Sequence, residues 1–228
     1  MDTYWYDGIS VYRSVYAPVS SNMFAMLVDN ETVIFDPNEN NELLELFCQN
    51  GIAKAHVLLT HGHYDHISGL GWLKEHVETD VCCHVATAKR LAGGMGSMIR
   101  MVPFILAQQD KQDGGHRYHD FKRNYRPYTC LADKTFEKET ELTFGNLTFH
   151  VIPTPGHSPG STCYILNDRI VFTGDTLLQD NAVITRFPES DDMIYQQVAL
   201  PFLKSLRKDM VIMPGHGEPF VLSETDNV

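Results

Sequence analysis

Thr60-His61-Gly62-His63-Tyr64-Asp65-His66 follows directly on the apolar run Val57-Leu58-Leu59. Three imidazoles and a carboxylate therefore stand at the end of a predicted buried strand. Neutral imidazole nitrogen and carboxylate oxygen are the ligands that borderline divalent cations prefer. The first two histidines, two residues apart, point the same way in an extended backbone, and Asp65 and His66 follow where the chain turns. The stretch predicts half of a metal site, in a two-metal arrangement.

Three later segments complete the pattern, because each ends a predicted strand in a ligand-type side chain beside Gly or Pro. They are Pro155-Gly156-His157-Ser158-Pro159-Gly160, Val171-Phe172-Thr173-Gly174-Asp175 and Val211-Ile212-Met213-Pro214-Gly215-His216-Gly217. Gly and Pro supply the sharp turns that such loops need. Ligands spread over four loops of this kind suit an active site at one edge of a sheet.

The four segments, in this order, resemble the motifs of the metallo-β-lactamase-fold hydrolase superfamily, and most of all its glyoxalase II-like branch. Val33-Ile34-Phe35-Asp36-Pro37 also resembles the family's early strand that ends in aspartate. The likeness runs through nearly the whole chain except for residues 92–140. It implies an αββα sandwich of two packed mixed β-sheets flanked by helices. The hydrophobic pattern alone reaches only an α/β or α+β fold.

The resemblance also implies two neighbouring metal sites. Their ligands are His61, His63 and His157 for one site, Asp65, His66 and His216 for the other, and Asp175 as a bridge. Asp36 is a candidate for orienting a ligand histidine through a hydrogen bond, and the alternative is a simple Asp-Pro turn. Two divalent ions are expected, with zinc first and iron or manganese as alternatives.

The expected activity is that of a dinuclear metallohydrolase. A hydroxide held by both ions attacks a small ester-type substrate, a thioester first, and Asp65 accepts the proton of the nucleophile. Lactones and phosphodiesters stay open, because no helical extension of the glutathione-binding kind is identified after His216. An aspartate at position 175, where many β-lactamases carry cysteine, and the absence of an export signal disfavour a β-lactamase. The same fold offers a persulfide dioxygenase with one iron ion, or a module that binds metal without turnover.

Length and composition indicate one globular domain spanning residues 1–228. The chain is 43% hydrophobic and 21% charged, which is ordinary for such a domain. Its net charge of −11 argues against a nucleic-acid partner. The five cysteines form no CxxC pair, and no secretory signal or membrane-length apolar run is visible. We therefore expect a cytoplasmic enzyme with a small-molecule substrate and no membrane partner.

Hydrophobic periodicity and turn residues predict the elements along the chain. Strands are expected over 9–16, 22–28, 31–36, 54–60, 80–85, 161–166 and 169–173, a hairpin over 142–152, and helices over 40–50, 67–78, 86–92 and 191–207.

Residues 93–140 interrupt this pattern and are predicted to be an insertion near the active site. The segment opens with Gly93-Gly94-Met95-Gly96 and carries eight Lys and Arg against six Asp and Glu. One hypothesis is a lid in which Arg117, Arg123 and Arg126 hold an anionic substrate bidentately. The alternative is that its apolar patch forms the interface of a homo-oligomer.

Overall fold

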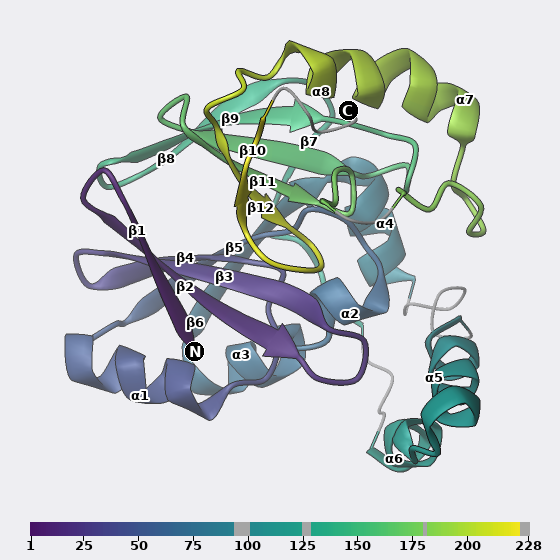
Figure 1. The fold of residues 1–228 in the computed structure, drawn as a ribbon. Helices are drawn as coiled ribbons and strands as arrows, with labels where there is room; N and C mark the ends of the chain where they lie inside the picture. Colours follow the sequence, from purple (N-terminus) through teal and green to yellow (C-terminus); the bar gives the residue numbers. More distant parts are fainter. Residues whose placement is uncertain (94–100, 125–128, 180–181, 224–228) are drawn as a thin grey trace.

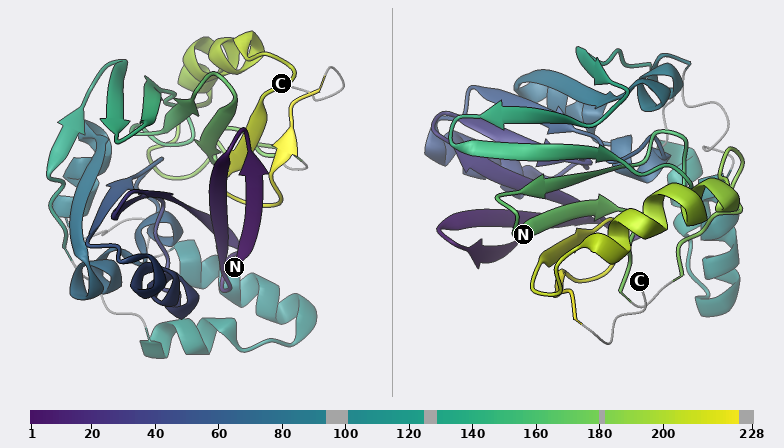
Figure 2. Two further views of the ribbon diagram at one scale, coloured as in Figure 1. Left: turned by 90° about the vertical axis from the view of Figure 1, so that its left-hand side faces the viewer. Right: turned by 90° about the horizontal axis from the view of Figure 1, so that it is seen from above.

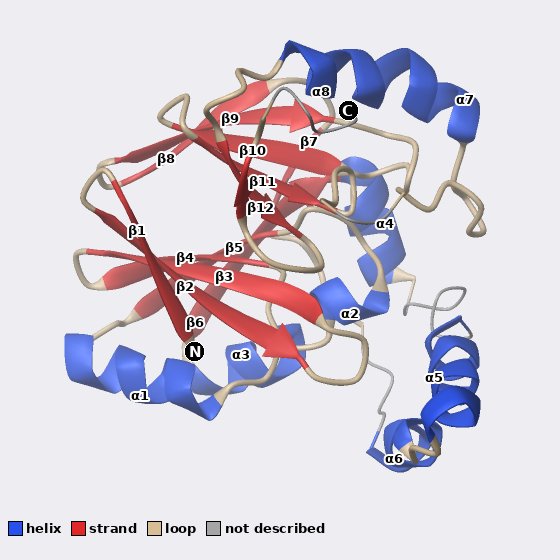
Figure 3. Cartoon of the chain, viewed as in Figure 1, coloured by secondary structure: helices blue, strands red, loops and turns tan. Residues whose placement is uncertain are grey.

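Two β-sheets pack face to face between outer layers of helices in the computed structural model (Figures 1 and 3). The structure describes residues 1–93, 101–124, 129–179 and 182–223. The two packed sheets and their flanking helices confirm the predicted αββα sandwich. Within the described residues, no helix combines the length and the apolar character needed to cross a bilayer.

The first sheet has seven strands in sequence order. They are β1 (Asp2–Tyr6), β2 (Ile9–Tyr16), β3 (Ser21–Val28), β4 (Glu31–Phe35), β5 (Lys54–Leu58), β6 (Glu78–His84) and β7 (Lys134–Phe136). Strands β1 to β4 pair antiparallel, and β4 to β7 pair parallel. The parallel half therefore directs the carboxyl ends of β4 and β5 to the same edge.

The second sheet has six strands in the order β13-β12-β11-β10-β9-β8. They are β8 (Thr140–Phe144), β9 (Leu147–Pro153), β10 (Thr162–Leu166), β11 (Ile170–Gly174), β12 (Val211–Pro214) and β13 (Phe220–Val221). Strand β10 runs antiparallel to both β9 and β11, and β11 runs parallel to β12. The carboxyl ends of β9, β11 and β12 therefore also meet at one edge.

Helices cover the outer faces of both sheets. They are α1 (Asn41–Asn50), α2 (Tyr64–Ile67), α3 (Leu70–His76), α4 (Val85–Ala92), α5 (Met101–Asp113), α6 (Arg117–Asn124), α7 (Asp192–Ile194) and α8 (Leu200–Ser205). Helices α1 and α3 lie against the first sheet, and α7 and α8 lie over the second (Figures 1 and 2). Helices α5 and α6 stand beside the sandwich, near the edge that carries α2 (Figure 1).

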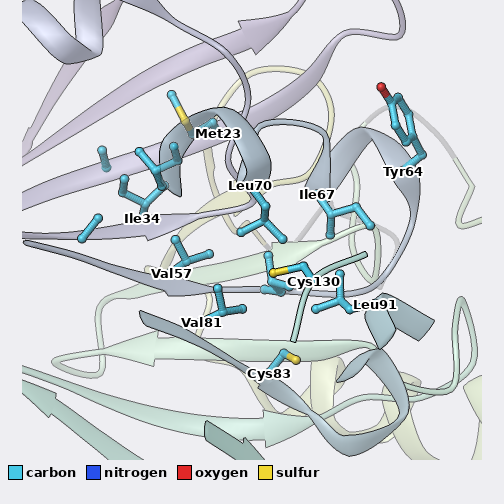
Figure 4. Close-up of a cluster of buried hydrophobic side chains, with 14 of the residues drawn as sticks. Met23, Ile34, Val57, Tyr64, Ile67, Leu70, Val81, Cys83, Leu91 and Cys130 are labelled. Carbon is cyan, nitrogen blue, oxygen red and sulfur yellow. The ribbon is translucent and has the colours of Figure 1, made fainter. Parts of the chain in front are cut away.

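Apolar side chains fill the space between each pair of layers. Between the sheets, the Phe35 ring stacks on Phe172 with 3.9 Å between centroids and meets Phe149 and Tyr164 edge-on. The core under the first sheet is shown in Figure 4 and includes Met23, Ile34, Val57, Ile67, Leu70, Val81, Cys83, Leu91 and Cys130. Burial of this kind is the main favourable term in folding.

The observed elements differ from the sequence prediction in three places. Strand β1 was not predicted. The helix expected over 67–78 is two short helices, α2 and α3, separated by a turn at Gly69. The helix expected over 191–207 is continuous through Pro201, but it contains a π-helical turn at Tyr195–Ala199. Pro201 is tolerated because it lies in the first turn after that segment.

The described part of residues 93–140 forms two helices and a strand. Helices α5 and α6 form a hairpin, and β7 then extends the first sheet. Buried Val102, Leu106 and Phe121 dock the hairpin onto the core of the first sheet. Of the opening stretch Gly93-Gly94-Met95-Gly96, the residues from Gly94 onward lie outside the part that the structure describes.

Candidate metal centre

Four side chains from three loops form the first group of potential ligands. They are His61, His63, His157 and Asp175, and one donor atom from each lies within 4.8 Å of the others. His157 Nε2 is 3.0 Å from His63 Nδ1 and 3.4 Å from Asp175 Oδ2. All three imidazoles are buried. Burial lowers their pKa, which favours the neutral form that a metal requires.

Asp65, His66 and His216 form a second group beside the first. Asp65 Oδ2 is 3.4 Å from His66 Nε2 and 3.3 Å from His216 Nε2. Burial acts to raise the pKa of Asp65, but the charge on His66 and a hydrogen bond from His216 lower it to about 2. Asp65 is therefore an ionised carboxylate at neutral pH.

Asp175 lies between the two groups and faces both. Its Oδ1 is 3.4 Å from His66 Nε2, and its Oδ2 is 3.4 Å from His157 Nε2 and 3.6 Å from His216 Nε2. One carboxylate therefore contacts both groups.

The hydrogen bonding of the buried donor atoms also fits a site for divalent ions. Among the described residues, His61 Nε2, His66 Nε2 and Asp175 Oδ1 are buried and have no hydrogen-bond partner. Leaving such atoms unsatisfied in the interior costs free energy, so buried polar atoms nearly always have a partner. Three orphaned atoms in one cluster of imidazole and carboxylate are explained by metal ions.

Asp36 lies behind this cluster, at the end of β4, and is buried. Its carboxylate accepts hydrogen bonds from the Thr60 amide at 2.8 Å and from the Thr60 hydroxyl at 2.5 Å. Its Oδ2 also lies 2.9 Å from His66 Nδ1, which can donate to it. The structure thus places Asp36 where it can orient a ligand histidine, in addition to forming the turn. Such contacts fix the tautomer that leaves Nε2 free for metal.

Glycine permits the close approach of the strands at the site. Gly215 follows β12, and a Cβ atom there would overlap Asp175 Oδ1 and crowd the ring of His66. Backbone hydrogen bonds from Gly215 to Gly174 and from Asn22 to Gly215 hold this loop between the two sheets. The ligands from the two sheets can meet because this position carries no side chain.

A family model described as the metallo-β-lactamase superfamily matches residues 17–216. The chain belongs to the metallo-β-lactamase superfamily. The resemblance inferred from the four sequence motifs is therefore confirmed. Membership of this superfamily, together with the His/Asp cluster, implies a site for divalent metal ions.

Two curated relatives and one solved structure show the extent of the likeness. "Probable metallo-hydrolase YqgX" of Bacillus subtilis (strain 168) is 27% identical over 217 residues, covering 94% of this chain and 93% of the relative. "Hydroxyacylglutathione hydrolase GloC" of Haemophilus influenzae is 27% identical over 192 residues, covering 83% and 81%. The BLEG-1 B3 metallo-β-lactamase superposes with a TM-score of 0.73 at 25% identity, covering 93% of this chain and 94% of that one.

In this superfamily member, a segment over residues 182–191 crosses the site, and sequence reasoning missed it. His157 Nδ1 donates to the carbonyl of Ile184 at 2.8 Å, and the Ser190 hydroxyl donates to the carbonyl of His157 at 2.6 Å. The Phe187 ring meets the imidazoles of His63 and His157 edge-on. We call residues 182–191 the covering segment. It fixes the orientation of His157 and shields the ligands from water.

An ion pair between Glu189 and Arg90 fastens the covering segment to α4. Arg90 is mostly buried, and its side chain packs directly against the backbone of Gly62, between two ligand histidines. Burial lowers the pKa of Arg90. The pair therefore joins the covering segment to the back of the metal loop.

The ligands open into a cavity of about 570 Å³. Helix α5 forms one wall with Val102, Ile105 and Gln109, and the covering segment contributes Ile184 and Phe187 to another. The predicted insertion therefore does border the metal site.

Two of the three arginines expected to bind substrate, Arg117 and Arg123, are absent from the described lining of this cavity. Arg117 forms ion pairs with Asp110 and Asp113 of α5 and lines a separate cavity of about 410 Å³. Arg123 does not line the 570 Å³ cavity among its described residues, and Arg126 lies outside the described residues. Their role toward a substrate remains a prediction from the sequence.

Proposed function

We propose that the protein is a dinuclear metallohydrolase that cleaves a small ester-type substrate, with a thioester as the first candidate. The observation that carries the proposal is the position of Asp175. Its two oxygens face the two ligand groups at 3.4 to 3.6 Å, as a bridge between two ions requires. Carboxylates of this kind support two-metal hydrolysis in many enzymes.

The candidate ligands of each ion are the same as those that the family resemblance implies. His61, His63 and His157 would hold one ion, Asp65, His66 and His216 would hold the other, and Asp175 would contribute to both sites. When bound, the ions supply Lewis acidity that activates water and polarises the scissile carbonyl. Zinc is the first candidate because imidazole and carboxylate suit it, and iron or manganese would also be accepted.

The protein's own residues complete the reaction. Asp65 faces the cavity as a carboxylate and is placed to receive the proton that attacking water releases. Thr60 and Asp36 hold His66 in one tautomer, and the Ile184 carbonyl does the same for His157. The covering segment limits access of bulk water, which strengthens electrostatic interactions in the cavity.

The choice of a thioester rests on a relative. The GloC protein, which matches most of this chain, is named as a hydrolase of hydroxyacylglutathione. YqgX, similar over more of the chain, is named only as a probable metallo-hydrolase. Thioester hydrolysis is therefore the reaction to test first, with lactones and phosphodiesters beside it.

The test combines metal analysis with a substrate panel. Purified protein should contain two divalent ions per chain by elemental analysis and should hydrolyse at least one thioester, with activity lost on chelation and restored by zinc. A single bound iron with consumption of oxygen and persulfide would replace the proposal with a dioxygenase. Full metal content without turnover of any ester, lactone or phosphodiester would indicate that the protein binds metal but is not a hydrolase.

A further inference from the structure

One part of the wall of the metal cavity is mostly apolar. Helix α5 presents Val102, Ile105 and Gln109 to it at steps of three and four residues, which is one face of a helix. Leu178, Ile184 and Phe187 contribute to the same cavity. Apart from Gln109, these side chains are apolar.

Charge in the cavity comes from the metal ligands alone. Among its described lining residues, the charged groups are Asp65, Asp175 and the ligand histidines, and none is Lys or Arg. Arg117 of the insertion directs its guanidinium at Asp110 and Asp113 instead. Away from the metal ligands, the described part of the wall offers no cation to an anionic tail, and placing an unpaired charge against apolar side chains carries a large desolvation cost.

We propose that the site selects an uncharged substrate with an apolar acyl chain, which lies along α5, and that Ile105 is a specificity-determining residue. This inference rests on the proposed hydrolase function and names its substrate class. The carbonyl sits at the metal ligands, and the chain extends over Ile105 toward Gln109, away from the two carboxylates. It replaces the anionic substrate expected from the arginine-rich sequence of the insertion.

Ile105 is the informative position because it lines the cavity without being fully buried. Val102 and Leu106 are buried in the core, so changing them would also disturb the hairpin. Phe104 offers a matched control: it lies next to Ile105 on the same helix, is 59% exposed, and does not line the cavity.

The binding test uses alkyl hydroxamates, which anchor to metal through one end and carry chains of different length at the other. Zinc-loaded protein is titrated calorimetrically with aceto-, butyro-, hexano- and octanohydroxamate, and with the monohydroxamate of succinic acid as a charged match. We expect affinity to rise by about fourfold for each methylene that becomes buried. The succinyl compound should bind no better than acetohydroxamate.

The Ile105→Lys variant tests whether Ile105 sets the preference for apolar chains over charged ones, and we expect it to reverse that preference. The variant should lose the gain with chain length and bind the succinyl compound more tightly than wild type, because it places a cation beside the chain. Phe104→Lys adds the same charge outside the cavity and should behave as wild type in both series. Matched acyl and succinyl thioesters assayed for kcat/KM should follow the same order.

The outcomes separate this inference from the proposed function. Affinity that does not change with chain length, or tighter binding of the succinyl compound by wild type, overturns the apolar substrate class even if thioesters are hydrolysed. Chain-dependent hydroxamate binding without any hydrolysis supports the apolar site and rejects the hydrolase function. Equal effects of Ile105→Lys and Phe104→Lys on hydroxamate binding would show that Ile105 does not determine specificity for the acyl chain.

Discussion

Asp175 is the residue on which both ligand groups depend, since its Oδ1 lies near His66 and its Oδ2 lies near both His157 and His216. Asp175→Ala should therefore lose bound metal and hydrolysis together, while the circular dichroism spectrum stays native. Asp209→Ala removes an exposed carboxylate remote from the site and should leave both unchanged. Hydrolysis near the wild-type rate with two ions bound to the Asp175 variant would show that this residue is not the bridge.

Asp36 allows a finer test, because it supports the candidate ligands from behind, contacting His66 directly and reaching His61 through the Thr60 hydroxyl. Asp36→Asn keeps the shape of the side chain but weakens its hydrogen bonds with His66 and Thr60. Loss of such an orienting carboxylate typically costs about 10- to 100-fold in metal affinity or activity. Competition with a chromophoric chelator measures the affinity. A zinc affinity equal to that of wild type would reduce Asp36 to a turn residue.

The ligand residues could be predicted because they are side chains of distinctive type at the ends of apolar strands. The covering segment could not, because its main contact with the site is the backbone carbonyl of Ile184, which any residue supplies. Arg117 shows a related limit of sequence reasoning. Its positive charge is visible in the sequence, but the carboxylates that neutralise it, Asp110 and Asp113, become its partners only when α5 and α6 fold together.

At the level of elements, the hairpin of α5 and α6 depends on one carboxylate. Asp110 accepts hydrogen bonds from the amides of Arg117 at 3.0 Å and Tyr118 at 2.8 Å, so it caps the first turn of α6. Desolvation acts to raise the pKa of Asp110, but these amides and the Arg117 guanidinium lower it below its ordinary value. A lowered pKa in the folded state means that ionisation of Asp110 stabilises the hairpin.

This stabilisation has a defined pH range. It is complete above the ordinary aspartate pKa of about 3.9 and is lost as the pH falls through the lower pKa of the folded state. The protection factors of the α6 amides, which correct for the intrinsic effect of pH on exchange, should therefore fall in acid before the sheets unfold. Asp110→Asn should lower these protection factors at neutral pH and remove their dependence on acid. A variant with wild-type protection throughout would show that the cap does not hold the hairpin.

The difference between α1 and α5 shows what local sequence can reveal. Asn40 caps α1 by accepting from the Leu43 amide, and Gly51 ends it with a φ of 64°, so both boundaries carry a recognisable residue. In α5 the apolar residues fill the first half and polar ones the second. Such a segment has no clear helical period in its sequence, and its docking through Val102 and Leu106 stabilises it as a helix.

For the molecule as a whole, the ions would join its two halves. The candidate ligands His61, His63, Asp65 and His66 follow strand β5 of the first sheet. The candidate ligands His157, Asp175 and His216 follow strands of the second sheet. Metal that binds only the folded state stabilises it by about 4 kcal/mol at a thousandfold excess over Kd. Removal of metal with a chelator should then lower the Tm by roughly 8 to 16 °C for a chain of this size. An unchanged Tm in a protein shown to be metal-free would contradict this role.

The interleaving of ligands from both sheets also determines when metal can enter. His61 and His216 belong to strands of different sheets, and contacts between such distant positions form late, because closing long loops is entropically costly. We therefore expect metal to bind a chain that has already paired its strands, and not to nucleate folding. Zinc should leave the refolding rate of the apoprotein unchanged and slow only its unfolding, as stopped-flow measurements with and without zinc would show. In kinetic terms, we expect metal to lower the unfolding rate constant and to leave the folding rate constant unchanged.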